Sequence, residues 1–182
     1  METTPDRDLD RFTDDVRAAP RDAGPLVMIV RRPTTDVRER VDEAPLDPAA
    51  GLVGDDWIRR RSRSTPDGSA DPEDQLTIMS TRVLAAIEPD PARWPLAGDQ
   101  LYVDLDLGVE NLPAGTRLAI GDAIVQVSEK PHTGCAKFSA RFGSDALRWI
   151  NGPDGRQLRM RGLNARIVQA GTVRVGDTVR KV

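Results

Sequence analysis

The chain is poor in the residues that build redox and metal centres. It has one cysteine, Cys135, and one histidine, His132, among 182 residues. A lone thiol excludes an internal disulfide and a cysteine-rich zinc or iron–sulfur site. A lone imidazole excludes a metal site made of several histidines. Any sulfur or soft-metal chemistry that needs a side chain of this protein must therefore involve Cys135.

Long apolar runs and a strong charge imbalance are also missing. The longest apolar run, residues 26–30, is far shorter than the roughly 20 residues of a membrane span. The formal net charge is −3, which gives no reason to expect nucleic-acid binding. The first ten residues lack the hydrophobic stretch of a secretory signal, and a single cysteine fits a reducing compartment. We therefore expect a cytoplasmic protein with neither a membrane nor a nucleic-acid partner.

Hydrophobic patterning predicts a mainly β fold with a few short helices. Runs of buried type or of alternating apolar and polar residues indicate strands, and apolar spacings of three and four indicate helices. The predicted strands are residues 26–30, 75–79, 99–107, 117–127 (two strands hinged at Gly121 and Asp122), 156–160, 165–168 and 173–179. The predicted helices are residues 6–18, 80–87 and 144–150. Many short strands separated by glycine turns indicate a closed or nearly closed barrel.

Three segments lie outside this pattern. Residues 51–57 read as a tight turn bounded by glycines, which can take a positive φ or approach a ligand closely. Residues 59–72 contain little that could be buried, so they predict a long exposed loop of functional interest. Residues 36–43 fit either a strand or a turn.

The residues around Cys135 suggest a reactive sulfur. His132 precedes it, and Lys137, one of only three lysines, follows it. Neighbouring cations favour the thiolate, which is the form that attacks, carries sulfur or binds a soft metal. In an extended segment Lys137 would share a face with Cys135, and Gly134 would leave room beside the sulfur. The alternative is that Cys135 is a small buried core residue.

His132 has two interpretations of its own. A neutral imidazole can act as a base, and a charged one can hold a thiolate. It could equally form a hydrogen bond within a turn next to Pro131.

Several short motifs occur in a recognisable order along the chain. They are GLVGD at 51–55, GDQL at 98–101, NL at 111–112 with GT at 115–116, IGDA at 120–123, CAK at 135–137 and VRVGD at 173–177. In this order they resemble the MOSC domain, the C-terminal module of molybdenum cofactor sulfurases. The resemblance covers residues 26–182 and is strongest from Gly98 onward.

The resemblance implies a fold and a chemistry. The fold would be a MOSC-type (pyruvate-kinase-like) β-barrel over residues 26–182, with a few short peripheral helices and a partly helical N-terminal extension over residues 1–25. Cys135 would carry sulfur as a persulfide or ligate molybdenum. The cofactor would be the molybdenum cofactor (molybdopterin), bound stably or transiently. A cysteine desulfurase or an electron-donor protein would be the partner.

The sequence also departs from its relatives. The chain lacks the large pyridoxal-phosphate desulfurase domain of the eukaryotic sulfurases, so we expect no pyridoxal phosphate here, although labels for the family mention it. The N-terminal barrel domain of some reductase relatives is absent. Thr133 and Gly134 stand where many relatives carry Arg or Pro around the cysteine. Residues 59–71 replace a region that does not align.

Candidate site residues fall into two groups, each with a structural alternative. Cys135, His132 and Lys137 are the candidates for chemistry, with Cys135 also the metal ligand. Candidate cofactor contacts are Thr133, Gly134, Asn111, Gly54, Asp55 and Arg141. Asn111 could bond a pterin edge or form a turn before Pro113. Asp55 could orient an arginine or a ligand amine, or simply stabilise its turn. Five arginines crowd the region after Cys135, and the sequence does not decide which one points inward: Arg141, Arg148, Arg156, Arg159 and Arg161.

Three functions therefore remain open. The first is a sulfur carrier or cofactor-binding module, which would act as a molybdenum cofactor sulfurtransferase if it is an enzyme. The second is a molybdenum-dependent oxidoreductase that reduces N-hydroxylated compounds with an electron-donor partner. The third is a barrel that binds a ligand or a protein without catalysis. The third predicts an unreactive Cys135, whereas retained molybdenum with turnover separates the second from the first.

Overall fold

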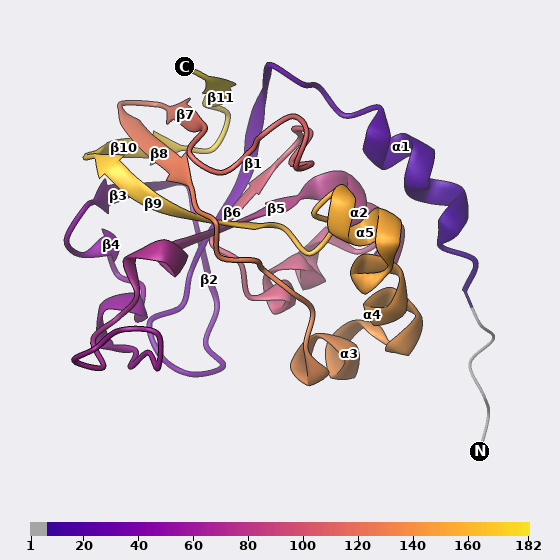
Figure 1. The fold of residues 1–182 in the computed structure, drawn as a ribbon, viewed down its shortest axis with the longest axis horizontal. Helices are drawn as coiled ribbons and strands as arrows, with labels where there is room; N and C mark the ends of the chain where they lie inside the picture. Colours follow the sequence, from indigo (N-terminus) through magenta and orange to yellow (C-terminus); the bar gives the residue numbers. More distant parts are fainter. Residues whose placement is uncertain (1–6) are drawn as a thin grey trace.

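Seven strands close into a barrel in the structure, a computed structural model that describes residues 7–182. The barrel strands are β1 (Ala23–Arg31), β5 (Leu76–Ser80), β6 (Leu101–Val103), β7 (Arg117–Ile120), β8 (Ala123–Val127), β9 (Leu163–Gln169) and β11 (Thr178–Lys181). Their order is β11-β7-β8-β9-β5-β6-β1, and β1 closes the ring by pairing with β11. Neighbouring strands run antiparallel, except that β5 and β6 are parallel. Figure 1 shows the strands crossing around a common centre.

Strand β1 makes the closure possible because it is long. It has nine residues, so its first part pairs with β11 and its last part pairs with β6 on one side and β2 (Glu39–Val41) on the other. The register between β1 and β6 shifts between Leu26 and Met28. Such an irregularity increases local twist, which helps a sheet to curve.

Alternating side chains fill the barrel. In β8, Ala123, Val125 and Val127 are buried, and the residues between them are partly exposed. These side chains join Leu76 and Leu118 in one apolar cluster inside the sheet. A fully buried aliphatic side chain stabilises a fold by roughly 1.5–3 kcal/mol, so this cluster is a major source of stability.

A small second sheet extends this core. Its strands are β3 (Glu43–Asp47), β4 (Gly51–Leu52) and β10 (Gly171–Arg174), in the order β10-β3-β4. Leu46, Leu52 and Val173 are buried in the cluster that fills the barrel.

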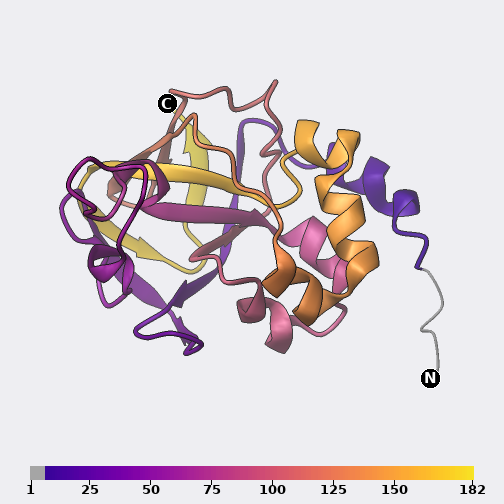
Figure 2. The same ribbon diagram turned by 60° about the horizontal axis from the view of Figure 1, so that its bottom comes forward.

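Short helices gather at one side of the barrel and enclose a second apolar core. They are the α-helices α1 (Thr13–Arg17), α2 (Thr81–Ile87), α3 (Ala136–Phe142), α4 (Ser144–Asn151) and α5 (Pro153–Gln157). The 3-10 helices are η1 (Asp10–Phe12), η2 (Trp57–Arg59), η3 (Pro72–Asp74) and η4 (Pro91–Ala97). Figures 1 and 2 both place the N-terminal and the orange helices on the same side. Leu9 and Val16 pack in this second core with Phe138 and Trp149, which anchors the N-terminal segment. No helix within residues 7–182 is long and apolar enough to cross a membrane.

The predicted mainly β barrel is confirmed, and three local predictions are wrong. Residues 156–160 form the end of α5 and a turn instead of a strand, because Pro153 starts a helix and Gly155 lies against backbone carbonyls of α4. Residues 99–107 supply a strand only at Leu101–Val103. Residues 173–179 are not one strand, because β10 ends at Arg174 and β11 begins at Thr178.

The N-terminal predictions meet a mixed outcome. The helix predicted over residues 6–18 is shorter in the structure, and residues 1–6 lie outside the described part. Strand β1 begins at Ala23, so it crosses the predicted boundary between residues 25 and 26. The residues before β1 therefore lead directly into the barrel.

Candidate functional site

A cleft of about 600 Å³ opens beside the barrel and collects most of the candidate residues. Cys135, His132, Thr133, Lys137 and Arg141 all line it. They reach it from the segment after β8 and from α3. Segments that follow β1 and β4 supply further walls, so the cleft is assembled from distant parts of the chain.

Cys135 stands immediately before α3. An extended segment would place Cys135 and Lys137 on one face, but of these two residues only Cys135 has an extended backbone, as the N-cap residue of the helix that contains Lys137. Its thiol is exposed. Hydrogen bonding to the Phe138 amide lowers the pKa of Cys135. Burial opposes this shift, and the Lys137 amide and the charges of Arg161 and Lys137 add to it. The thiol therefore favours the thiolate form, as the sequence suggested. The cause is mainly hydrogen bonding at the start of a helix instead of neighbouring cations in an extended segment.

His132 is held by a buried carboxylate. Its Nε2 lies 3.0 Å from Oδ1 of Asp99, whose side chain has no exposed surface. The other oxygen of Asp99 accepts a 2.6 Å hydrogen bond from Nη1 of Arg161. Burial opposes ionisation of Asp99, but the Arg161 charge and the His132 hydrogen bond outweigh it and lower the pKa of Asp99 to about 2. Asp99 is therefore a carboxylate at neutral pH.

This arrangement assigns the proton of His132. Burial lowers the pKa of His132, the charge of Arg161 lowers it further, and Asp99 opposes both. Because an ionised carboxylate only accepts hydrogen bonds, the neutral imidazole carries its proton on Nε2 and presents Nδ1 as an acceptor. The geometry thus favours the neutral, base-like His132 over the cation that would hold a thiolate. Arg161 supplies the positive charge instead.

Arg161 is itself fixed from several sides. Its Nη2 donates to the Ala97 carbonyl at 2.9 Å, and its guanidinium lies over the Phe138 ring, 5.1 Å from the centroid. Its Nε is buried without a hydrogen-bond partner in the described chain. Of the arginines that follow Cys135, Arg141 and Arg161 line the cleft, and Arg161 is the one whose charge acts on the thiol.

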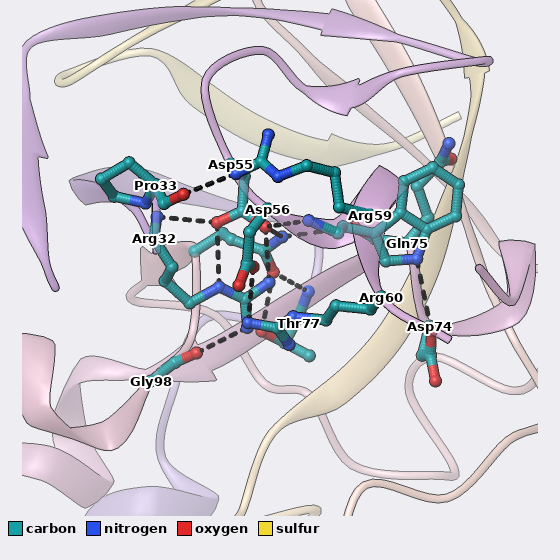
Figure 3. Close-up of polar contacts among 12 residues, drawn as sticks. Arg32, Pro33, Asp55, Asp56, Arg59, Arg60, Asp74, Gln75, Thr77 and Gly98 are labelled. Atoms are coloured by element: carbon teal, nitrogen blue, oxygen red, sulfur yellow. Dashed lines mark hydrogen bonds and ion pairs between the residues drawn. The ribbon is translucent and has the colours of Figure 1, made fainter. Parts of the chain in front are cut away.

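A second buried ion pair lies near the first, because both arginines donate to residues 97–99. Arg32 follows β1, and its Nε and Nη2 donate to the two oxygens of Asp55 at 2.9 and 2.8 Å (Figure 3). Its Nη1 donates to the Gly98 carbonyl, and Nε2 of Gln100 also reaches Asp55. Burial opposes ionisation of Asp55, but bonding to Arg32 lowers its pKa. Asp55 thus orients an arginine, which was one of its expected roles. Its pairing with Arg32 accounts for its burial without any contact to a ligand.

Arg38 adds a positive charge, unpaired in the described part of the chain, beside Arg141, which itself pairs with Asp36 at 3.4 Å. Nη2 of Arg38 and Nη1 of Arg141 lie 3.6 and 3.8 Å from the point that a Cβ would occupy at Gly98. Burial lowers the pKa of Arg38, and the charges of Arg141 and Arg32 lower it further. Nε of Arg38 is buried without a hydrogen-bond partner in the described residues. Like charges held together in this way favour an anionic ligand between them.

Most acidic side chains of the cleft are already paired. Lys130 binds Asp71 at 2.9 Å and also contacts Asp74, and Asp56 pairs with Arg60 at 2.7 Å. By contrast, neither Arg38 nor Lys137 has an ion-pair partner within residues 7–182. The predicted exposed loop of residues 59–71 contributes one wall, through Arg60, Arg61, Ser62, Ala70 and Asp71.

Four of the predicted cofactor contacts are not among the residues that line the cleft: Gly54, Asp55, Asn111 and Gly134. Asn111 uses its amide elsewhere, donating to the Arg21 and Asp106 carbonyls and accepting from Lys181. Its structural role replaces the expected contact with a pterin. Gly54 has a φ of 93° and faces Arg31, which makes it a turn residue.

Gly134 has a different reason to be glycine than the one expected. A Cβ there would lie 2.7 Å from Leu147 and 2.8 Å from Ile150 of α4. Its amide donates to Asn151, which donates back to its carbonyl. The missing side chain therefore allows the loop to pack on α4, and it does not provide space beside the sulfur.

Sequence reasoning missed three residues in or beside the cleft, Arg32, Arg38 and Asp99, and did not single out Arg161 among the arginines after Cys135. Asp99 had a signal, because it lies in the GDQL motif together with Gly98. Arg38 lies in a stretch whose pattern fitted either a strand or a turn. Arg32 and Arg161 were two arginines among many, and only the fold places them.

The donor set suits an anionic cofactor that brings its own metal ligands. A single exposed thiolate can add one soft ligand to molybdenum, and guanidinium groups are the preferred partners of phosphate. Within residues 7–182, no cluster of three or more His, Cys, Asp and Glu side chains could hold a bare metal ion.

Comparisons with known proteins agree with this fold. The family model of the MOSC domain matches residues 67–180. YuaD from Bacillus subtilis is similar in structure, with a TM-score of 0.56 and 18% identity over 86% of this chain and 94% of that one. YiiM from Escherichia coli has a TM-score of 0.57 and 21% identity, over 88% of this chain and 69% of that one. YiiM from Geobacillus stearothermophilus has a TM-score of 0.61 and 16% identity, over 87% of this chain and 75% of that one. Identities this low show a shared fold alone, and no curated protein matches the sequence. The match over most of its length nevertheless establishes that the chain belongs to the MOSC domain family.

Proposed function

We propose that the cleft binds the molybdenum cofactor and that Cys135 is its reactive contact, either as a molybdenum ligand or as a persulfide carrier. One observation carries the proposal. The exposed thiol with a lowered pKa lies in the same cleft as Arg38, a guanidinium that has no ion-pair partner in the described residues and lies beside Arg141 and Arg32. A sulfur ligand and an anion site are the two features that a phosphate-bearing, metal-bearing pterin requires.

The cleft residues divide into two functions under this proposal. Arg38 and Arg141, with Arg32 behind them, would hold the phosphate-bearing end. Cys135 would face the metal-bearing end, and Lys137 would keep the sulfur ionised. The volume of about 600 Å³ lies within the range of cofactor sites. When bound, the cofactor supplies molybdenum for two-electron and sulfur or oxygen transfer chemistry.

The sulfur-carrier form of the proposal has a simple balanced step. The Cys135 thiolate attacks the outer sulfur of a donor persulfide, such as that of a cysteine desulfurase. The new bond joins the Cys135 sulfur to the transferred sulfur, and the donor leaves as a thiolate. The charge of Arg161 favours the attacking thiolate at neutral pH.

His132 would assist from the wall of the cleft. Its Nδ1 is the acceptor that Asp99 leaves free for a proton or a ligand N–H. In this role His132 contacts the ligand, and Asp99 and Arg161 position it. His132 would therefore act on the ligand, whereas Lys137 would act on the sulfur of Cys135.

Reconstitution with isolated molybdenum cofactor tests the proposal. Bound molybdenum per chain would be measured after gel filtration for the unaltered protein, Cys135→Ala, Arg38→Gln and the control Arg180→Gln, whose arginine is exposed on β11 outside the cleft. We expect loading in the unaltered protein and the control. Losing one charged hydrogen-bonding partner should weaken binding roughly tenfold or more in Arg38→Gln.

The same samples separate the two forms of the proposal. A metal ligand predicts that molybdenum is lost from Cys135→Ala. A carrier predicts a mass increase of one sulfur on the unaltered chain after incubation with a cysteine desulfurase and cysteine, absent in Cys135→Ala. Equal loading of all four proteins, with no sulfur on Cys135, would reject the proposal.

A further inference from the structure

A second cleft lies behind the segment that carries His132. It has a volume of about 510 Å³ and is lined by Val109, Ile150, Leu163 and Arg159, among others. Residues 130–133, Arg161 and Asn164 line both this cleft and the one that holds Cys135. Asn164 ties the shared segment down through the Lys130 and Pro131 carbonyls, at 3.1 and 3.3 Å. The two clefts therefore share a fixed wall.

Arg159 is the unusual residue of this second cleft. It takes a φ of 46°, a conformation that residues other than glycine rarely adopt. Its Nη1 donates to the carbonyls of Leu107 and Leu112, at 3.2 and 2.6 Å. Burial lowers the pKa of Arg159, and no carboxylate within residues 7–182 pairs with it. A partly buried cation anchored only by neutral groups is expected to attract an anion.

The anchoring also determines how such an anion would bind. Two carbonyls occupy Nη1, which leaves Nε and Nη2 without a partner in the described chain. These two atoms form the edge of a guanidinium that binds a carboxylate through two parallel hydrogen bonds. Neighbouring Arg156 is exposed and adds positive charge, and Glu129 is the acidic residue among those described in the lining.

We propose that the second cleft binds a small carboxylate with an apolar body, through Arg159 at the acid and Ile150 and Leu163 at the body. The volume is within the range of small-molecule sites. A ligand there would meet one face of the His132 wall, while the other face belongs to the Cys135 cleft. This inference goes beyond the proposed function and does not depend on the cofactor.

Phenylacetate is a suitable probe, with phenylacetamide as its uncharged match. His132 is the only histidine, so its imidazole gives a single NMR signal in tag-free protein that reports on the shared wall. We expect saturable shifts with phenylacetate and affinity at least tenfold weaker with phenylacetamide. These titrations use cofactor-free protein, so failure here is separate from failure of the proposed function.

Variants locate the carboxylate. We expect Arg159→Gln to weaken phenylacetate binding at least tenfold and Arg38→Gln, in the other cleft, to leave it within twofold. Arg159→Lys should also bind phenylacetate severalfold more weakly, because lysine cannot form two parallel hydrogen bonds with a carboxylate. This variant provides the test if Arg159→Gln does not fold. Equal binding of the amide, unchanged affinity in both Arg159 variants, or loss in Arg38→Gln would each overturn the inference.

Discussion

Replacing Asp99 by Asn tests the buried group at the centre of the site. The change keeps the shape of the side chain but removes the charge that faces Arg161 at 2.6 Å and His132 at 3.0 Å. Arg161 would then be a buried cation without its counter-charge. Breaking a buried pair in this way costs about 3–5 kcal/mol, a large part of the total stability of a typical domain.

Equilibrium urea unfolding measures this cost. The matched control is Asp14→Asn, because Asp14 pairs with Arg17 on an exposed helix and its side chain is 94% exposed. We expect the control to change stability by less than about 0.5 kcal/mol. Combining Asp99→Asn with Arg161→Met removes both charges, so the double variant should be more stable than the sum of the single costs predicts. A cost below about 1 kcal/mol for Asp99→Asn, or simple additivity, would refute the reasoning.

The pH dependence of the same variant gives an independent check. The pKa of Asp99 is lowered from 3.8 to about 2 in the folded protein. Its ionisation therefore contributes stability that is complete above pH 3.8 and is lost as the pH falls through about 2. The contribution is on the order of 2 kcal/mol. The stability difference between the unaltered protein and Asp99→Asn should narrow toward pH 2; a constant difference would contradict the assignment.

Three further predictions concern the thiol and its supports. Alkylation of Cys135 by iodoacetamide should follow a pH profile with a midpoint below that of an ordinary thiol, and Lys137→Gln should move the midpoint upward; a midpoint at or above the ordinary value contradicts the lowered pKa. Gly134→Ala should cost about 1–3 kcal/mol in urea unfolding, because its Cβ meets Leu147 at 2.7 Å; an unchanged midpoint would mean that the loop is free to move. Asp55→Ala should destabilise by about 3–5 kcal/mol by leaving Arg32 buried and unpaired, and a neutral result in the same assay would show that water reaches Arg32.

The barrel could be predicted from the sequence because the patterns that indicate strands are local. Alternation in β7 and β8 and the apolar run in β1 follow from neighbouring residues alone, and closure follows from many short strands. The predicted strand at residues 156–160 was wrong because the pattern of apolar residues holds no information about the packing of Gly155 against α4. That contact belongs to packing and leaves no trace in local periodicity.

The site was partly predictable for a related reason. Cys135, His132 and Lys137 share one segment, so their proximity is visible in the sequence, and the structure places all three in one cleft. Asp99 and Arg161 come from distant segments, and only the pairing of strands brings them to His132. Asn111 was wrongly predicted to contact the cofactor, because its side-chain amide already forms hydrogen bonds with a backbone carbonyl and with Lys181.

The most direct test of the central claim is the molybdenum content per chain after purification from a cofactor-producing host. The unaltered protein and Cys135→Ala would be compared side by side, with equal folding verified by urea unfolding. The account predicts molybdenum in the unaltered protein and much less in the variant. Equal molybdenum in both, or none in either even after reconstitution with excess cofactor, would contradict the assignment of this cleft and of Cys135.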